Sequence, residues 1–183
     1  GVQTCALPIS DAFVPNLAVL LNSLANRLGD FERREDALAA AEEAVCLYRR
    51  LAAARPDIFA PDLAMSLAVL ANMFEATGRR TDALPADEEA LRLLIPWFQR
   101  HPASFVRPIA EYAREYIRRC EAAGQKPNAA LWVPMARALL AMQAEGGTGG
   151  APPADHTYPS PEDTERWNLF RWLRRQWRSW RRT

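Results

Sequence analysis

The feature that most constrains this chain is a segment that occurs twice, with its second copy 46 residues after the first. When residues 13–58 are laid over residues 59–104, about 19 of the 46 pairs are identical. The identical pairs include Phe13 with Phe59, Pro15 with Pro61, Asn26 with Asn72, Asp36 with Asp82 and Glu42 with Glu88. A period of this length is typical of a repeat array, in which each unit is one supersecondary element that packs on the next.

A third copy begins at Phe105 and then diverges from the other two. We expect an array over residues 10–145, with units at about 13–58, 59–104 and 105–143. In the third unit the apolar pattern predicts a first helix over Phe105–Ala123 and a second over about Asn128–Gln143. A divergent last unit is typical of a capping repeat, although drift under weak selection would look the same.

Each unit has the apolar period of two helices and lacks the alternation of a strand. In the first unit the leucines that recur at helical spacing are Leu17, Leu20, Leu21, Leu24 and Leu28. Gly78 predicts the end of a helix, and the prolines at 56 and 102 predict the end of each second helix, because proline cannot continue one. The sequence therefore predicts an all-α array of stacked helix-turn-helix repeats.

Composition argues against several classes of function. The net charge of +1 gives little bulk attraction to nucleic acid, and no apolar run approaches the roughly 18 residues of a membrane helix. Cys46 and Cys120 lie in helical patterns without metal-ligand spacing, which favours a reducing, cytoplasmic location. No phosphate-binding loop, HExxH motif or nucleophile elbow is present, so we expect no catalytic residue, metal, cofactor or small-molecule substrate.

The second unit carries a known pattern. It comprises Leu67, Leu70, Ala71, Phe74, Gly78, Arg79, Arg80, Asp82, Ala83, Leu84, Glu88, Glu89, Ala90 and Leu93. Over about residues 10–142 the chain resembles tetratricopeptide repeats, in the long-period form of kinesin-light-chain-like and bacterial signalling arrays. The first unit departs once, with Glu32 where the family has glycine.

The resemblance implies an all-α, right-handed α-solenoid of helix-turn-helix repeats. It also implies a protein or peptide partner held in a concave groove that the first helix of each unit lines. By position, the groove residues would be Asn22, Asn26, Asn72, Arg114 and Arg118. Asparagine can both donate to and accept from a peptide backbone, and arginine can hold a carboxylate through two bonds. The alternative interpretation is that these are solvated polar positions.

The first nine residues, GVQTCALPI, lack the period and read as the translation of a sequencing-adapter oligonucleotide. The repeat places Ser10 opposite Pro56 and Pro102, and an adapter ending in T would turn a proline codon into a serine codon. We interpret residues 1–9 as a non-native leader, which allows for earlier repeats upstream.

The C-terminal segment is the other distinctive feature. Residues 146–159 are rich in glycine and proline and predict a flexible linker. Residues 160–183 predict a basic, tryptophan-rich amphipathic helix. Its apolar face includes Phe170, Trp177 and Trp180, and its opposite face includes Arg174, Arg178 and Arg181. Three uses fit: docking onto the array or a partner, which we favour, lying on an anionic membrane surface, or, least favoured, binding nucleic acid.

Together these features predict a non-catalytic protein–protein interaction scaffold that binds a peptide or protein segment. We expect it to be a fragment of a larger bacterial signalling or regulatory protein. The alternative function is a peripheral membrane adaptor anchored by residues 160–183.

Overall fold

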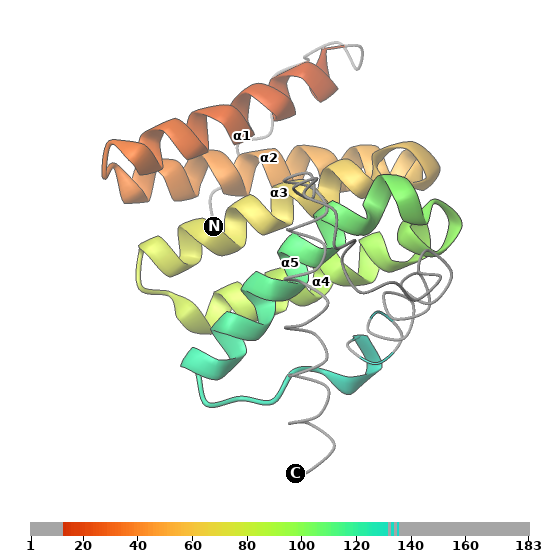
Figure 1. Cartoon of the computed structure of the whole chain (residues 1–183). Helices are drawn as coiled ribbons and strands as arrows, with labels where there is room; N and C mark the ends of the chain where they lie inside the picture. Colours follow the sequence, from red (N-terminus) through yellow and green to blue (C-terminus); the bar gives the residue numbers. More distant parts are fainter. Residues whose placement is uncertain (1–12, 132, 134, 136–183) are drawn as a thin grey trace, which may run out of the picture.

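The computed structural model of the chain describes residues 13–131, 133 and 135, and these residues are helical or in turns, with no strand among them. The helices are α1 (Val14–Asp30), α2 (Arg34–Ala54), α3 (Pro56–Ala76), α4 (Arg80–Arg100) and α5 (Pro102–Ala122), shown in Figure 1. Consecutive helices pack on one another along the chain. The predicted all-α solenoid of stacked helix pairs is confirmed.

The helix ends follow the period of the sequence. Adding 46 to the bounds of α2 (34 and 54) gives those of α4 (80 and 100), and adding 46 to those of α3 (56 and 76) gives those of α5 (102 and 122). The units begin at Pro56 and Pro102, three residues before the boundaries expected at 59 and 105. Proline fits the first helical position because its missing N–H would have no intrahelical partner there.

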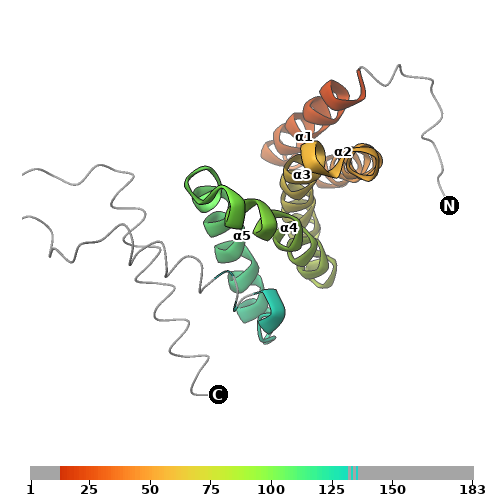
Figure 2. The ribbon, with the colours of Figure 1, turned by 90° about the vertical axis from the view of Figure 1, so that its right-hand side faces the viewer.

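The helices form two layers. Within each pair, α2 and α4 lie on the same side of their partners in Figure 2. Contacts join α1 to α2 and α3, and α4 to α3 and α5. Alanines with no exposed surface recur where the backbones approach, at positions 18, 25, 37, 64, 71 and 83. Larger buried side chains fill the space between them, each contributing about 1.5–3 kcal/mol.

Helix α3 is long and apolar enough to meet a composition criterion for a membrane-spanning helix, so the expectation that no such run exists was wrong. The cause lies in its position in the stack. α3 packs against α2 on one side and α4 on the other, so its apolar residues face two neighbours. Its hydropathy is that of a central core helix.

The turn after each first helix contains a residue with positive φ. These residues are Glu32 (φ 58°), Gly78 (φ 80°) and Gly124 (φ 64°). In each turn the N–H of the following residue donates to a backbone carbonyl five residues earlier and so caps the end of the helix. In the first turn, for example, the N–H of Arg33 donates to the carbonyl of Leu28 at 2.9 Å. Gly78 therefore ends α3 as predicted, and Glu32 adopts the conformation that the glycines adopt in the other units.

Glu32→Gly should raise the free energy of unfolding by about 0.5–1 kcal/mol. A left-handed conformation costs an L-residue roughly 1–2 kcal/mol, and the greater freedom of glycine in the unfolded chain offsets part of that gain. Gly78→Ala is the control, and it should destabilise by about 1 kcal/mol. A Cβ at residue 78 would have no atom within 4 Å, so only backbone strain acts there. Urea unfolding of both variants measures this, and equal effects at the two sites would contradict it.

Helical structure resumes after the third turn at residues 129–131. Asn128 caps this segment, since its Oδ1 accepts from the N–H of Ala130 at 3.1 Å. This agrees with the start predicted at Asn128, and Leu131 and Met135 are buried. The rest of that helix, the linker 146–159, the helix over 160–183 with its named tryptophans and arginines, and the leader 1–9 lie outside the described residues.

Candidate protein-binding face

The first helices share an uncovered side. On α3 it carries Ile58, Asp62, Met65, Val69 and Asn72, which recur at helical spacing and are exposed or half-buried. The same positions are Asn16, Val19, Ser23 and Asn26 on α1, and Glu111, Glu115 and Arg118 on α5. We call these residues the open face.

Three of the five predicted groove residues occupy one position of the repeat. Asn26, Asn72 and Arg118 are spaced by 46 residues and are all exposed, on α1, α3 and α5 respectively. Asn26 makes no polar side-chain contact within the described residues. The structure therefore aligns these three side chains in one row across the open face.

The other two predicted residues share a second position of the repeat, and it differs between the units. Asn22 is buried, and its Nδ2 donates to the Ser66 Oγ at 2.6 Å, which joins α1 to α3. Its Oδ1 has no partner among the described atoms. Arg114 is exposed on α5. The amide of Asn22 is therefore used between helices, and it is not offered on the open face as predicted.

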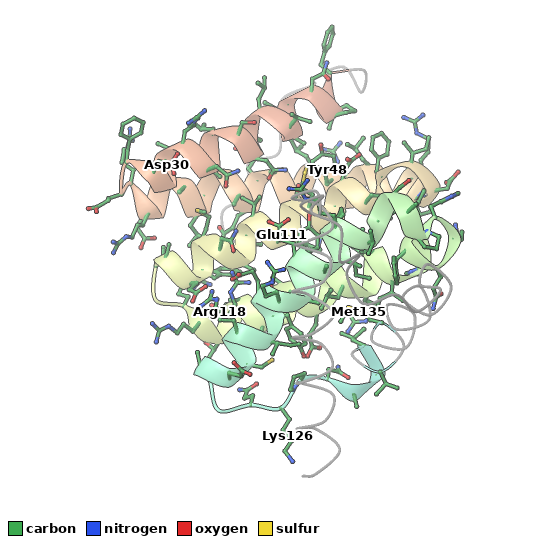
Figure 3. The ribbon with its side chains drawn as sticks, in the orientation of Figure 1. Asp30, Tyr48, Glu111, Arg118, Lys126 and Met135 are labelled. Atoms are coloured by element: carbon green, nitrogen blue, oxygen red, sulfur yellow. The ribbon has the colours of Figure 1, made fainter. Side chains whose placement is uncertain are left out.

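Arg118 already holds a carboxylate within the protein. Its guanidinium donates to both carboxylate oxygens of Glu75, with Nη1 2.9 Å from Oε1, and its Nε donates to Glu115 at 2.9 Å. The hydrogen bond from Arg118 is the main cause that lowers the pKa of Glu75 to about 2. In Figure 3 Arg118 lies on α5 close to the end of α3. The contact predicted for a partner's carboxylate is made by Glu75 instead.

The residue after Arg118 was missed by the sequence analysis and organises this region. Arg119 is buried, and its Nη1 lies 2.7 and 2.8 Å from the two carboxylate oxygens of Asp87 on α4. Its Nε donates to Glu75 at 3.0 Å and its Nη2 to Asn72 Oδ1. We call Asn72, Glu75, Asp87, Arg118 and Arg119 the Arg119 cluster. It joins α3, α4 and α5 through side chains.

The Arg119 cluster also orients Asn72. Because Arg119 donates to its Oδ1, the amide nitrogen of Asn72 is directed elsewhere, and no described side chain or carbonyl accepts from it. Burial raises the pKa of Asp87 to about 6, against the opposing effect of Arg119. At neutral pH the ion pair with Arg119 is therefore charged, and Asn72 is held as a donor.

The register of the repeat contained a signal for this cluster. Arg119 stands where the second unit has Met73, and Asp87 stands where the first has Ala41. Opposite charges at these two positions of adjacent units, where Met73 and Ala41 are uncharged, predict a contact between Arg119 and Asp87. A comparison of the units for such paired changes would have found it.

Beside the row of Asn26, Asn72 and Arg118, the open face mixes apolar and acidic side chains. Ile58 and Met65 are exposed on α3. The carboxylates of Asp62 and Glu111 have no ion-pair partner among the described residues, and burial raises the pKa of Asp62. No group of acidic, histidine or cysteine side chains in residues 13–135 that the structure describes could hold a metal. The face therefore fits a segment that brings apolar and basic side chains.

Comparison with known families agrees with this architecture. Residues 17–54 and 63–94 each match the family model for the tetratricopeptide repeat. The two matched segments cover most of the pairs α1–α2 and α3–α4. They support a tetratricopeptide repeat protein, and repeats of this kind generally mediate protein–protein interactions. A search of curated protein sequences gave no significant match.

Proposed function

We propose that this chain is a non-catalytic interaction scaffold that binds an extended peptide or protein segment along the open face. The row formed by Asn26, Asn72 and Arg118 carries the proposal. Two amides at the same position of adjacent units can each pair with the backbone of one bound chain. The Arg119 cluster supports this role because it fixes the orientation of Asn72 before a partner arrives.

The chemistry around the row favours one kind of segment. Side chains such as Met65 adapt to different apolar partners, and Asp62 and Glu111 attract basic residues. By analogy with the arrays that the chain resembles, we place the scaffold in a larger bacterial signalling or regulatory protein. The cysteine pattern of the sequence favours a cytoplasmic location. Attachment to an anionic membrane through residues 160–183 remains a prediction from sequence.

The double substitution Asn26→Ala and Asn72→Ala should weaken binding of a selected peptide by about 5- to 150-fold. Each neutral hydrogen bond contributes about 0.5–1.5 kcal/mol, and the two losses add because the sites lie on different helices. Peptides would be selected from a displayed random library against the full chain. Their dissociation constants would be measured by calorimetry for the wild-type and variant chains.

Gln99→Ala is the matched control, because it removes an exposed amide from α4 in the other layer. Its effect on the dissociation constant should stay within about twofold. Selected peptides that bind the double variant as tightly as the wild-type chain would refute the assignment of the row. Loss of binding in Gln99→Ala alone would place the site on the second helices.

A further inference from the structure

One side of α1, together with Phe13 directly before the helix, is apolar and exposed where the same side of α3 is covered. Phe13, Leu20 and Leu24 are 64%, 65% and 48% exposed. The residues at the same positions of α3, namely Phe59, Ser66 and Leu70, are 8%, 0% and 7% exposed. Three neighbouring large apolar side chains in water are unusual for a folded surface and indicate a contact site.

The helix that covers this side of α3 is known. α1 packs on α2 in the same way that α3 packs on α4, so the pairing within a unit is alike. α3 has two additional neighbours from the unit before it, namely its second helix α2 and its first helix α1, whose Asn22 bonds Ser66. The contact with α2 is the more extensive of the two. α5 repeats the arrangement with α4 as its preceding helix, because Tyr116 is buried and Phe105 and Tyr112 are half-buried at the same positions. The face that α1 leaves open is therefore the one that accepts a preceding second helix.

Arg27, at one end of this face, indicates that the docked helix carries an acidic side chain. Arg27 of α1 occupies the position of Arg119 in α5, two periods earlier. Arg119 is held by Asp87 of α4, the helix that precedes α5. Arg27 instead has an exposed contact with Asp30 at 3.8 Å. A helix docked on α1 as α4 docks on α5 would place the counterpart of Asp87 opposite Arg27.

We propose that Phe13, Leu20, Leu24 and Arg27 form a docking face for an amphipathic α-helix of the α4 type, which enters as the second helix of a preceding unit and carries a carboxylate opposite Arg27. The contact reproduces an interface that this chain already forms twice, between α2 and α3 and between α4 and α5. It is separate from the open face, so it extends the array without occupying the proposed peptide site.

The test supplies such a helix in register. The full chain is extended by a copy of residues 34–55 in place of residues 1–9, so that the added Arg55 precedes Ser10 as it precedes Pro56. Amide hydrogen exchange in α1 should slow at least about tenfold, and the melting temperature should rise by roughly 5 °C. Replacing the counterpart of Ala41 in the added copy with Asp should slow exchange further, and Arg27→Ala should remove only that further slowing.

Leu20→Glu with Leu24→Glu is the control for the apolar contact. In the original chain both positions are exposed, so these substitutions should leave the fold intact, and in the extended chain they should abolish the protection of α1. Unchanged exchange in the extended chain would overturn the proposal, as would protection that survives both glutamates. A dimer of the original chain that Leu20→Glu dissociates would assign the face to a second copy. Faster exchange in α1 after deletion of residues 160–183 would assign it to that segment.

Discussion

Arg119→Ala should lower the free energy of unfolding by about 3–5 kcal/mol, the largest effect that we expect from a single substitution outside the apolar core. The substitution leaves the carboxylate of Asp87 buried without its paired guanidinium. It also removes the donors to Glu75 and Asn72, so side-chain links between α3, α4 and α5 are lost together. Urea unfolding of the full chain measures the change.

The contact between the first and second units, which we call the first junction, has no ion pair where the second junction, between the second and third units, has Arg119 and Asp87. Met73 stands in place of Arg119, Ala41 in place of Asp87 and Gly29 in place of Glu75. The Met73 side chain lies over Gly29, where an added Cβ would sit 3.6 Å from Cε. Packing of a flexible thioether against small residues replaces the ion pair there.

Arg119→Met combined with Asp87→Ala should therefore restore stability to within about 1–2 kcal/mol of the wild-type chain. Replacing a buried ion pair by apolar residues of similar volume is often neutral, whereas removing one partner is not. A double variant that is less stable than Arg119→Ala would contradict this account. It would show that Glu75 and Asn72 depend on Arg119 more than Asp87 does.

Tyr116→Phe should destabilise the chain by about 1–3 kcal/mol and loosen the segment that follows α5. The buried hydroxyl donates to Glu88 on α4 at 2.8 Å and accepts from the N–H of Asn128 at 2.8 Å. Asn128 Nδ2 also donates to Glu88 at 3.1 Å. Loss of the hydroxyl removes one partner from each of two half-buried groups, the Glu88 carboxylate and the Asn128 N–H, and a polar group left unsatisfied costs about 1–3 kcal/mol when buried.

Amide exchange at residues 128–131 should increase in Tyr116→Phe, because the turn loses its attachment to α4 and α5. Tyr112→Phe provides the matched control on the same helix, since its half-buried hydroxyl has no hydrogen bond among the described residues. That control should change stability by less than about 0.5 kcal/mol. Equal effects of the two variants would mean that ring packing, and not the hydroxyl, holds the turn.

The repeat in the sequence predicted most of the fold, because α3 and α5 each pack on the second helix before them and α2 and α4 each pack on the first helix of their own unit. The ends of the second helices before Pro56 and Pro102, the turn at Gly78 and the helix start at Asn128 were predicted from local chemistry. The next first helices begin at these same prolines, three residues before the expected boundaries. The strain at Glu32 could be anticipated as well, since glycine stands at that position in the other units. Local signals therefore sufficed for the elements and their order.

The candidate site was harder to predict because it depends on how neighbouring helices cross. Asn22 and Asn26 lie one helical turn apart and look equivalent in sequence. Only the approach of α3 shows that Asn22 meets Ser66 while Asn26 stays exposed. Arg118 looked available for a partner because its contact with Glu75 spans 43 residues. A contact between residues so far apart in sequence cannot be predicted from the pattern of a single helix.

The two junctions of the array are filled by different chemistry, and this gives the units a fixed order. If α3 and α5 were exchanged, the Arg119 guanidinium would pack against Ala41 of α2. The Met73 thioether would pack against Asp87 of α4. Each mismatch leaves a buried charge alone, so the shuffled chain would lose stability at both places. Each contact between units therefore accepts only one of the two first helices. Recombination between these similar copies would be selected against wherever it separates Arg119 from Asp87 or Met73 from Ala41.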